Sequence, residues 1–215
     1  MSGFLGDLFP LLWSGMIMGC LYALGALGLV MIFKSSKVVN FSHGNVAGLA
    51  AFLVYGLSSG TLMNLSWGSA VLVTIVAIVA VAFLTYAIIS PLVFSSDLTA
   101  TIATLGIGLI AQGATLLIFG ADIVSLDLPV PRYSTSILGL RITGYDLTVL
   151  AVAVATIGGL FFVIDHTKLG IAFRAISHNP FAAEVCGLNL RSVHVFSWVV
   201  AAILGVVGAL LIVPT

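Results

Sequence analysis

The 215-residue chain is 61% hydrophobic, carries only 7% charged residues and has a formal net charge of zero. A typical soluble domain contains about 25% charged residues, and a water-soluble fold of this length could not bury so much apolar surface. The composition therefore excludes an ordinary soluble protein, and the neutral charge gives no indication of a nucleic-acid partner. It predicts an all-α integral membrane protein, a polytopic bundle of about six transmembrane helices.

The charged residues are clustered, which leaves three long uncharged stretches, 8–33, 38–96 and 98–121. A span needs about 20 apolar residues to cross about 30 Å of hydrocarbon. The first and third stretches each fit one span, and the second fits two. In chain order the predicted spans are 8–33, 38–57, 69–94, 98–121, 147–164 and 195–213.

The first predicted span follows no basic region, so it is expected to be a permanent helix rather than a signal peptide. The second, 38–57, opens with polar or small residues and is the least helix-like. We expect a broken or re-entrant segment there, which membrane depth permits only where protein or a water-filled cavity satisfies the backbone. Asn40 is expected to be a cap or turn residue. For His43, bracing of neighbouring helices is favoured over direct contact with substrate.

The basic residues predict the orientation. If the N-terminus lies outside, the inside loops carry five of the seven, which are Lys34, Lys37, Lys168, Arg174 and Arg191. The outside loops then carry Arg132 and Arg141, together with Asp7, Asp122, Asp127 and Asp146. This asymmetry predicts an extracytoplasmic N-terminus.

Two predicted loops are long. Residues 122–146 face outside and contain several prolines and glycines, which predict an ordered cap or short-turn region. Residues 165–194 face inside, where Leu169, Phe173 and Ile176 fall at helical spacing and predict one apolar stripe.

A second short helix is predicted in the same inside loop. Asn179 is its expected N-cap, Pro180 its first residue and Gly187 its stop. On the basic side of the membrane, a short capped helix suits a soluble partner. The alternative, a helix lying passively on the lipid headgroups, stays open from the pattern alone.

No Asp, Glu, Lys or Arg lies within the predicted spans, which argues against intramembrane aspartyl chemistry and against a carboxylate proton relay. Ser42 and His43 are only sequence neighbours, and adjacency does not make a catalytic pair. The chain has no Gly-Lys-Ser/Thr phosphate loop, so any ATP hydrolysis is expected on another chain. Cys20 falls in a span and Cys186 in a polar loop, so neither a disulfide nor a metal site is expected. We predict no enzyme activity and no cofactor.

Small residues recur at helical spacing. Gly15 with Gly19, and Gly44 with Gly48, form GxxxG patterns, which permit close helix packing in lipid. The pattern indicates a packed bundle more often than a gate.

Four stretches in order resemble one family, the permease subunits of branched-chain amino acid ABC importers, which also contains urea permeases. The stretches are 22–29 followed by Ile32 and Phe33; 38–44, similar to an Asn-Phe-Ala/Ser-His-Gly signature; 102–106 with Gln112, Phe119 and Gly120; and 167–175 followed by Asn179, Pro180, Ala182, Ala183 and 187–189. The turn Lys34-Ser35-Ser36-Lys37 departs from the resemblance, because a turn containing Gly is expected there.

The resemblance implies roles for two groups of residues. The translocation path or the bracing of its helices would involve Asn40, Phe41, His43, Gly44 and Gln112. A cytoplasmic coupling helix within 165–194 would dock on the ATPase through Arg174, Asn179, Pro180, Ala182, Ala183 and Gly187.

The implied partners are a second permease subunit, identical or different, two cytoplasmic ATP-binding-cassette ATPases, an extracytoplasmic substrate-binding protein and membrane lipid. The implied location is the bacterial inner membrane. Because the family has further spans, residues 1–215 are expected to be one permease domain, truncated at its C-terminus. Open alternatives are a urea or short-amide ABC permease, a stand-alone channel or secondary transporter for a small neutral solute, and a structural membrane protein.

Overall fold

The computed structural model describes residues 2–93, 96–121, 129–130, 133–137 and 140–213. The elements that form the bundle are α1 (Ser2–Ser36), α2 (His43–Ser58), α3 (Trp67–Val93), α4 (Asp97–Phe119), α5 (Gly144–His166) and α8 (Leu190–Ile212). Two short strands, β1 (Ser134–Ile137) and β2 (Leu140–Thr143), precede α5, and two short helices, α6 (Lys168–His178) and α7 (Pro180–Val185), follow it.

Five of these helices, α1, α3, α4, α5 and α8, are long and apolar enough to cross a membrane in the part of the chain that the structure describes. This confirms the predicted polytopic helix bundle. The second predicted span differs, because α2 has 16 residues and begins at His43. At 1.5 Å per residue it is about 24 Å long, short of about 30 Å of hydrocarbon. A non-helical segment, residues 37–42, joins it to α1.

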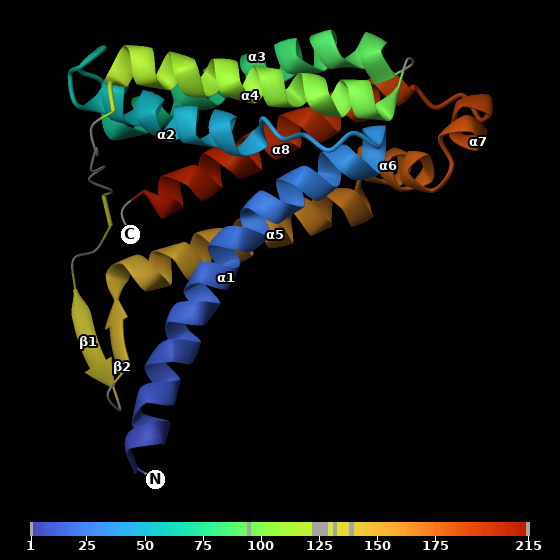
Figure 1. The fold of residues 1–215 in the computed structure, drawn as a ribbon. Helices are drawn as coiled ribbons and strands as arrows, with labels where there is room; N and C mark the ends of the chain where they lie inside the picture. The colour runs from blue at the N-terminus through green and yellow to red at the C-terminus, as the bar shows by residue number, and fades with distance from the viewer. Residues whose placement is uncertain (1, 94–95, 122–128, 131–132, 138–139, 214–215) are drawn as a thin grey trace.

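Helix α8 is the centre of the bundle. It lies between a layer formed by α2, α3 and α4 and a second group formed by α1 and α5 (Figure 1). Residues of α8 belong to all three apolar clusters: Leu204 packs with α1 and α5, Val206 with α2 and α3, and Trp198 with the C-terminal ends of α1 and α3. In contrast, α4 and α5 leave most of their apolar surface uncovered.

A hairpin of β1 and β2 connects α4 to α5, with Thr135 opposite Ile142. Thr143 then caps α5 reciprocally with Asp146: the Asp146 N–H donates to Thr143 Oγ (3.2 Å), and the Thr143 N–H donates to the Asp146 carboxylate (2.9 Å). Trp13 of α1 also donates to this carboxylate, at 3.4 Å. The hairpin and the α5 cap form part of the predicted outside loop, of which residues 122–128, 131–132 and 138–139 lie outside the described residues.

Helices α5 and α6 meet at a sharp corner made by Thr167. Its backbone N–H ends α5 by donating to Val163 O (3.1 Å), and its side chain caps α6 by accepting from the Gly170 N–H (3.1 Å). The buried residues of α6 are Gly170, Phe173 and Ile176. The predicted stripe is therefore right for Phe173 and Ile176 and wrong for Leu169, which is exposed because the helix turns Gly170 toward α5 instead.

The predicted caps of α7 are confirmed. Asn179 Oδ1 accepts from the Ala182 N–H (3.0 Å), and Pro180 is the first helical residue. Beyond the end of the helix, Gly187 adopts a φ of 83°, a conformation that suits glycine.

Candidate translocation and coupling sites

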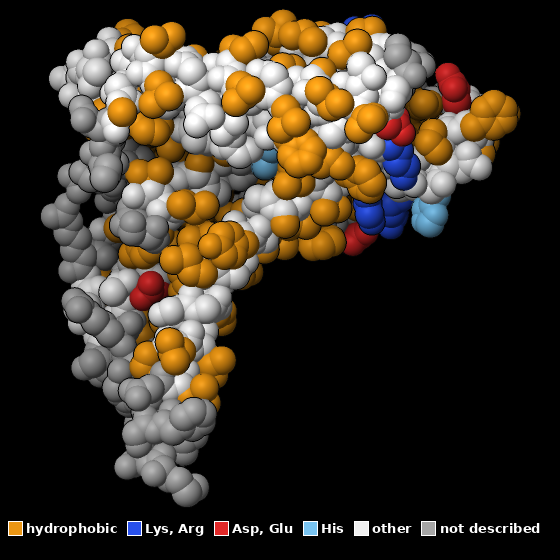
Figure 2. All heavy atoms as spheres, in the orientation of Figure 1, with side chains coloured by type: hydrophobic (Ala, Val, Ile, Leu, Met, Phe, Trp, Pro, Cys, Tyr) orange, Lys and Arg blue, Asp and Glu red, His pale blue; other side chains and the backbone are white. Residues whose placement is uncertain are grey.

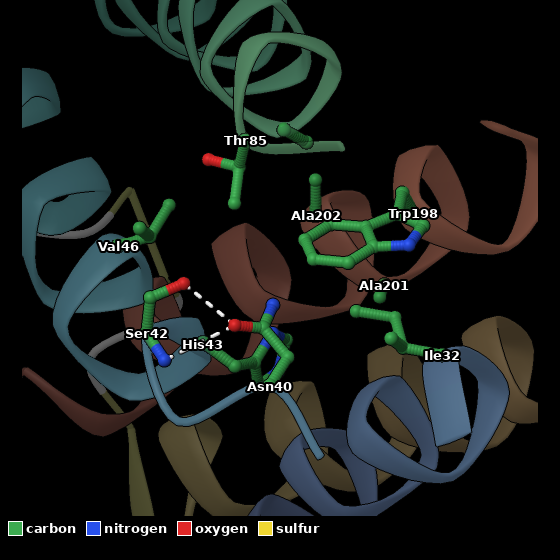
Figure 3. Close-up of a pocket in the computed structure, with 10 residues that line it drawn as sticks. Ile32, Asn40, Ser42, His43, Val46, Thr85, Trp198, Ala201 and Ala202 are labelled. Carbon is green, nitrogen blue, oxygen red and sulfur yellow. Dashed lines mark hydrogen bonds between the residues drawn. The ribbon is translucent and has the colours of Figure 1, made fainter. Parts of the chain in front are cut away.

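Residues 37–42, which include Asn40 of the signature stretch, form a non-helical link between α1 and α2, inside the bundle. Asn40 is buried, and its Oδ1 accepts hydrogen bonds from the Ser42 N–H (3.1 Å) and the Ser42 hydroxyl (2.6 Å), as Figure 3 shows. Asn40 therefore makes a local turn that carries the chain into α2.

Thr104 of α4 supports the same link from across the bundle. Its hydroxyl oxygen accepts from the Phe41 N–H at 3.0 Å and lies 3.3 Å from Val39 O. Thr104 is completely buried. Backbone that is not helical is tolerated at membrane depth only where protein groups or a water-filled cavity satisfy it, and Thr104 supplies one such group here. Thr104 belongs to the 102–106 motif, but the sequence alone assigned no role to it.

His43, the first residue of α2, lies against the backbones of α1 and α8. A Cβ atom added to Gly28 would lie 2.7 Å from the His43 Nε2 atom, and one added to Gly205 would lie 3.1 Å from Cε1. The imidazole is 8% exposed, and Nε2 has no hydrogen-bond partner among the described residues. The ring thus fills the junction of α1, α2 and α8, where Gly28 and Gly205 leave room for it. Gly15 and Gly19, which were picked out by their spacing, have no described neighbour at the Cβ position.

A small internal cavity of about 20 Å³ adjoins this junction. Asn40, Ser42 and His43 line one side of it, and Thr85 and Trp198 line the other (Figure 3). Its volume suits a single water molecule and is far too small for an amino acid. This junction is therefore not a substrate pocket in the conformation described.

A groove of about 260 Å³ lies on the outer side of the same region, between α2 and α4. Gly44, Gly48, Asn45 and Gln112 contribute to its lining. No other described side chain fills the Cβ positions of Gly44 and Gly48, so their small surfaces face the groove. Of the five residues predicted for the path or its bracing, the structure brings together Asn40 with His43 inside the bundle and Gly44 with Gln112 on the groove, and it leaves Phe41 exposed.

We expect Thr104→Val to lower the free energy of unfolding by about 1–3 kcal/mol, because the partly buried Phe41 N–H loses its acceptor while the side-chain shape is kept. Thr104→Ser, which retains the hydroxyl, should be much milder. Thr115→Val is a matched control, since its hydroxyl donates only within α4, to Ala111 O. Thermal unfolding of the purified variants measures the differences. Equal midpoints for Thr104→Val and Thr115→Val would contradict the supporting role of Thr104.

The predicted coupling residues occupy different faces of α6 and α7. Arg174 forms an ion pair of 3.3 Å with Asp165, in which both side chains are about half exposed, so the pair contributes little stability. Ala183 is buried in the core of the chain itself. The outward side chains of α7 are instead Phe181 and Val185, exposed by 76% and 74%. Neither residue was among those predicted from the sequence, although a large apolar side chain in a polar loop is a usable signal.

Residues 11–215 match the family described as branched-chain amino acid transport system / permease component. The chain belongs to this family. This permease chain is 24% identical to the high-affinity branched-chain amino acid transport system permease protein BraD of Pseudomonas aeruginosa over 213 residues, covering 93% of the chain and 68% of BraD. It is 28% identical to the probable branched-chain amino acid transport permease protein LivH of Methanocaldococcus jannaschii, covering 94% of the chain and 65% of LivH.

A third relative carries a different printed function. The guanosine ABC transporter permease protein NupQ of Bacillus subtilis is 28% identical over 194 residues, covering 81% of the chain and 58% of NupQ. The permease chain thus spans about two thirds or less of the length of these relatives. No solved structure gives a significant match. Family membership and the span-length helices together make the chain a multi-pass membrane permease component.

Proposed function

We propose that this chain forms half of an ATP-driven import path for branched-chain or similar amino acids in a bacterial inner membrane. The observation that carries the proposal is the family match over residues 11–215. ATP would be hydrolysed by two separate ATPase subunits, and an extracytoplasmic binding protein would deliver the substrate.

The α2–α4 groove is the best candidate for one wall of the path. Its glycines leave an open face that a second permease subunit, identical or different, can approach closely. Its amide groups, from Asn45 and Gln112, can exchange hydrogen bonds with a passing polar group. A lining of small and apolar residues with a few neutral polar groups suits an aliphatic zwitterion. A transport path must release such a substrate as readily as it binds it. His43 and Asn40 would brace this wall from inside.

The other functional surface is α7, at the end of the bundle where Lys and Arg side chains gather (Figure 2). Its caps hold a short helix rigidly, and Phe181 and Val185 project from it. We assign this face to docking on the ATPase. The alternative is a helix that lies passively on the lipid headgroups, and co-purification of the ATPase distinguishes the two.

Uptake of labelled solutes tests the transport proposal. In proteoliposomes that contain the complete transporter, its binding protein and internal ATP, we expect accumulation of L-leucine and none of guanosine or urea. Guanosine is the second candidate because of the similarity to NupQ. Accumulation of guanosine instead of leucine would replace the substrate class, and ATP-independent equilibration would favour a stand-alone channel.

The native Cys186 provides a test of topology, since its side chain is exposed beyond α7. If the N-terminus is extracytoplasmic, a membrane-impermeant thiol reagent applied to intact cells should not label Cys186 but should label it after permeabilisation. In a Cys186→Ser background, Ser134→Cys in the hairpin should react in intact cells. Labelling of Cys186 from outside would reverse the proposed orientation.

A further inference from the structure

A second, larger cavity lies at the cytoplasmic end in the proposed topology, away from the α2–α4 groove. It has a volume of about 750 Å³ and separates α7 from the adjoining ends of α1, α3, α4 and α8. Ligand pockets in proteins are typically about 300–1,000 Å³. Its floor is buried and largely apolar or aromatic, formed by Tyr86, Ile89 and Trp198.

The rim of this cavity carries charges of both signs. Lys37, after α1, and Arg191, in α8, supply positive charge, while Asp97, in α4, and Glu184, in α7, supply negative charge. Side chains of both signs are visible at this end in Figure 2. Within the described parts of the chain, no ion pair joins any two of these four residues. None of the four charges is therefore neutralised by another of them, and the Lys37 ammonium group lies 6.0 Å from the centroid of the exposed Phe33 ring, one turn earlier in the chain.

The backbone conformation of Lys37 also indicates a role for this side chain. Lys37 has a φ of 60° and is the one residue other than glycine with a positive φ among those described. This left-handed conformation crowds a Cβ atom, and glycine adopts it without that cost. The position directly after a helix commonly carries glycine for this reason. A lysine at this position is explained if its ammonium group binds a ligand in the cavity.

We propose that this cavity binds a free α-amino acid from the cytoplasm. Lys37 and Arg191 would receive its carboxylate, Asp97 and Glu184 its ammonium group, and the Tyr86–Ile89–Trp198 floor its aliphatic side chain. A bound amino acid bridges α7 to the bundle and restrains the helix proposed to meet the ATPase. Accumulated product thereby slows further import. The cytoplasmic location and the choice of an amino acid rest on the proposed function; the zwitterionic chemistry rests on the rim charges.

Direct binding to the purified transporter complex, without ATP or binding protein, tests the site. The probes are L-leucine, 4-methylpentanoate, which lacks the amino group, and 3-methylbutylamine, which lacks the carboxylate. We expect each analogue to bind at least about tenfold more weakly than leucine, because each leaves one pair of rim charges unmatched.

Lys37→Gly is the decisive variant, since it relieves the backbone conformation and cannot lose binding through local strain. We expect a loss of about tenfold or more in leucine affinity. Lys34→Gln is the matched control, because Lys34 lies three residues earlier, is exposed and does not line the cavity. Its affinity should equal that of the unmodified protein. In proteoliposomes loaded with leucine, Lys37→Gly should also relieve the slowing of uptake.

The proposal would be overturned by no leucine binding, by equal binding of either analogue, or by leucine binding that Lys37→Gly leaves unchanged. The last would place the leucine elsewhere, for example on the α2–α4 groove. Binding that appears only when zwitterionic phospholipid is removed would identify a lipid headgroup as the occupant instead. If leucine binds as expected but no leucine uptake occurs, the proposed transport function fails and the binding site stands.

Discussion

Gly170→Ala is expected to disrupt the α5–α6 corner and to abolish ATP-driven uptake. A Cβ atom at residue 170 would lie 2.1 Å from the carbonyl oxygen of Ile164 and 2.5 Å from its carbonyl carbon. These are backbone atoms at the end of α5, so the clash cannot be relieved by rotating a side chain. The two helices must separate, which moves α7 and everything that docks on it.

This overpacking should lower the free energy of unfolding by about 3 kcal/mol or more, the upper end of the usual range for overpacking at a buried site. The same step breaks the Thr167 cap, because the Gly170 N–H that donates to Thr167 Oγ moves away with α6. Monodispersity and thermal midpoint of the purified permease, together with co-purification of the ATPase, measure the effect.

Gly158→Ala provides the matched control within α5. Gly158 is exposed, and apart from the backbone of its own helix turn no described atom lies within 4 Å of its Cβ position. Alanine stabilises a helix interior relative to glycine by about 1 kcal/mol, so this variant should fold at least as well as the unmodified chain. If Gly170→Ala matched Gly158→Ala in stability and uptake, the close approach of α6 to Ile164 would not exist in the membrane.

Phe181→Asp is expected to reduce ATPase co-purification by about tenfold or more while leaving the permease folded. Phe181 is 76% exposed and packs into none of the apolar clusters, so the fold does not depend on it. A large aromatic side chain exposed on a rigid helix is a typical anchor of a protein interface, and such anchors contribute about 2 kcal/mol or more. A carboxylate there would have to be buried without a partner in the interface.

Two further variants separate docking from folding. Phe181→Met keeps a large apolar side chain and should retain most of the ATPase. Ala183→Arg should instead lower the yield of folded permease, because Ala183 is 5% exposed in the core of the chain. Full ATPase retention and full uptake in Phe181→Asp would show that α7 rests on the membrane surface and would remove the main support for the docking proposal.

The features that the sequence predicted well are those governed by local chemistry. Stretches without charged residues predict transmembrane helices. Asn179, Pro180 and Gly187 predict the ends of α7, because capping depends only on residues within one turn. The signature around Asn40 also predicted a break in the second span, since polar and small residues at membrane depth need local hydrogen bonds.

Tertiary structure decided which residues meet across the bundle. Thr104 accepts a hydrogen bond from Phe41, which lies 63 positions away in the chain. His43 packs against Gly28 and Gly205, neither of which belongs to the GxxxG patterns picked out in the sequence. Ala183, which the family resemblance made a candidate for the partner surface, faces inward because α7 lies against α6 and α8. Local pattern fixes where a helix begins and ends, but the face that it buries depends on neighbours contributed by distant segments of the chain.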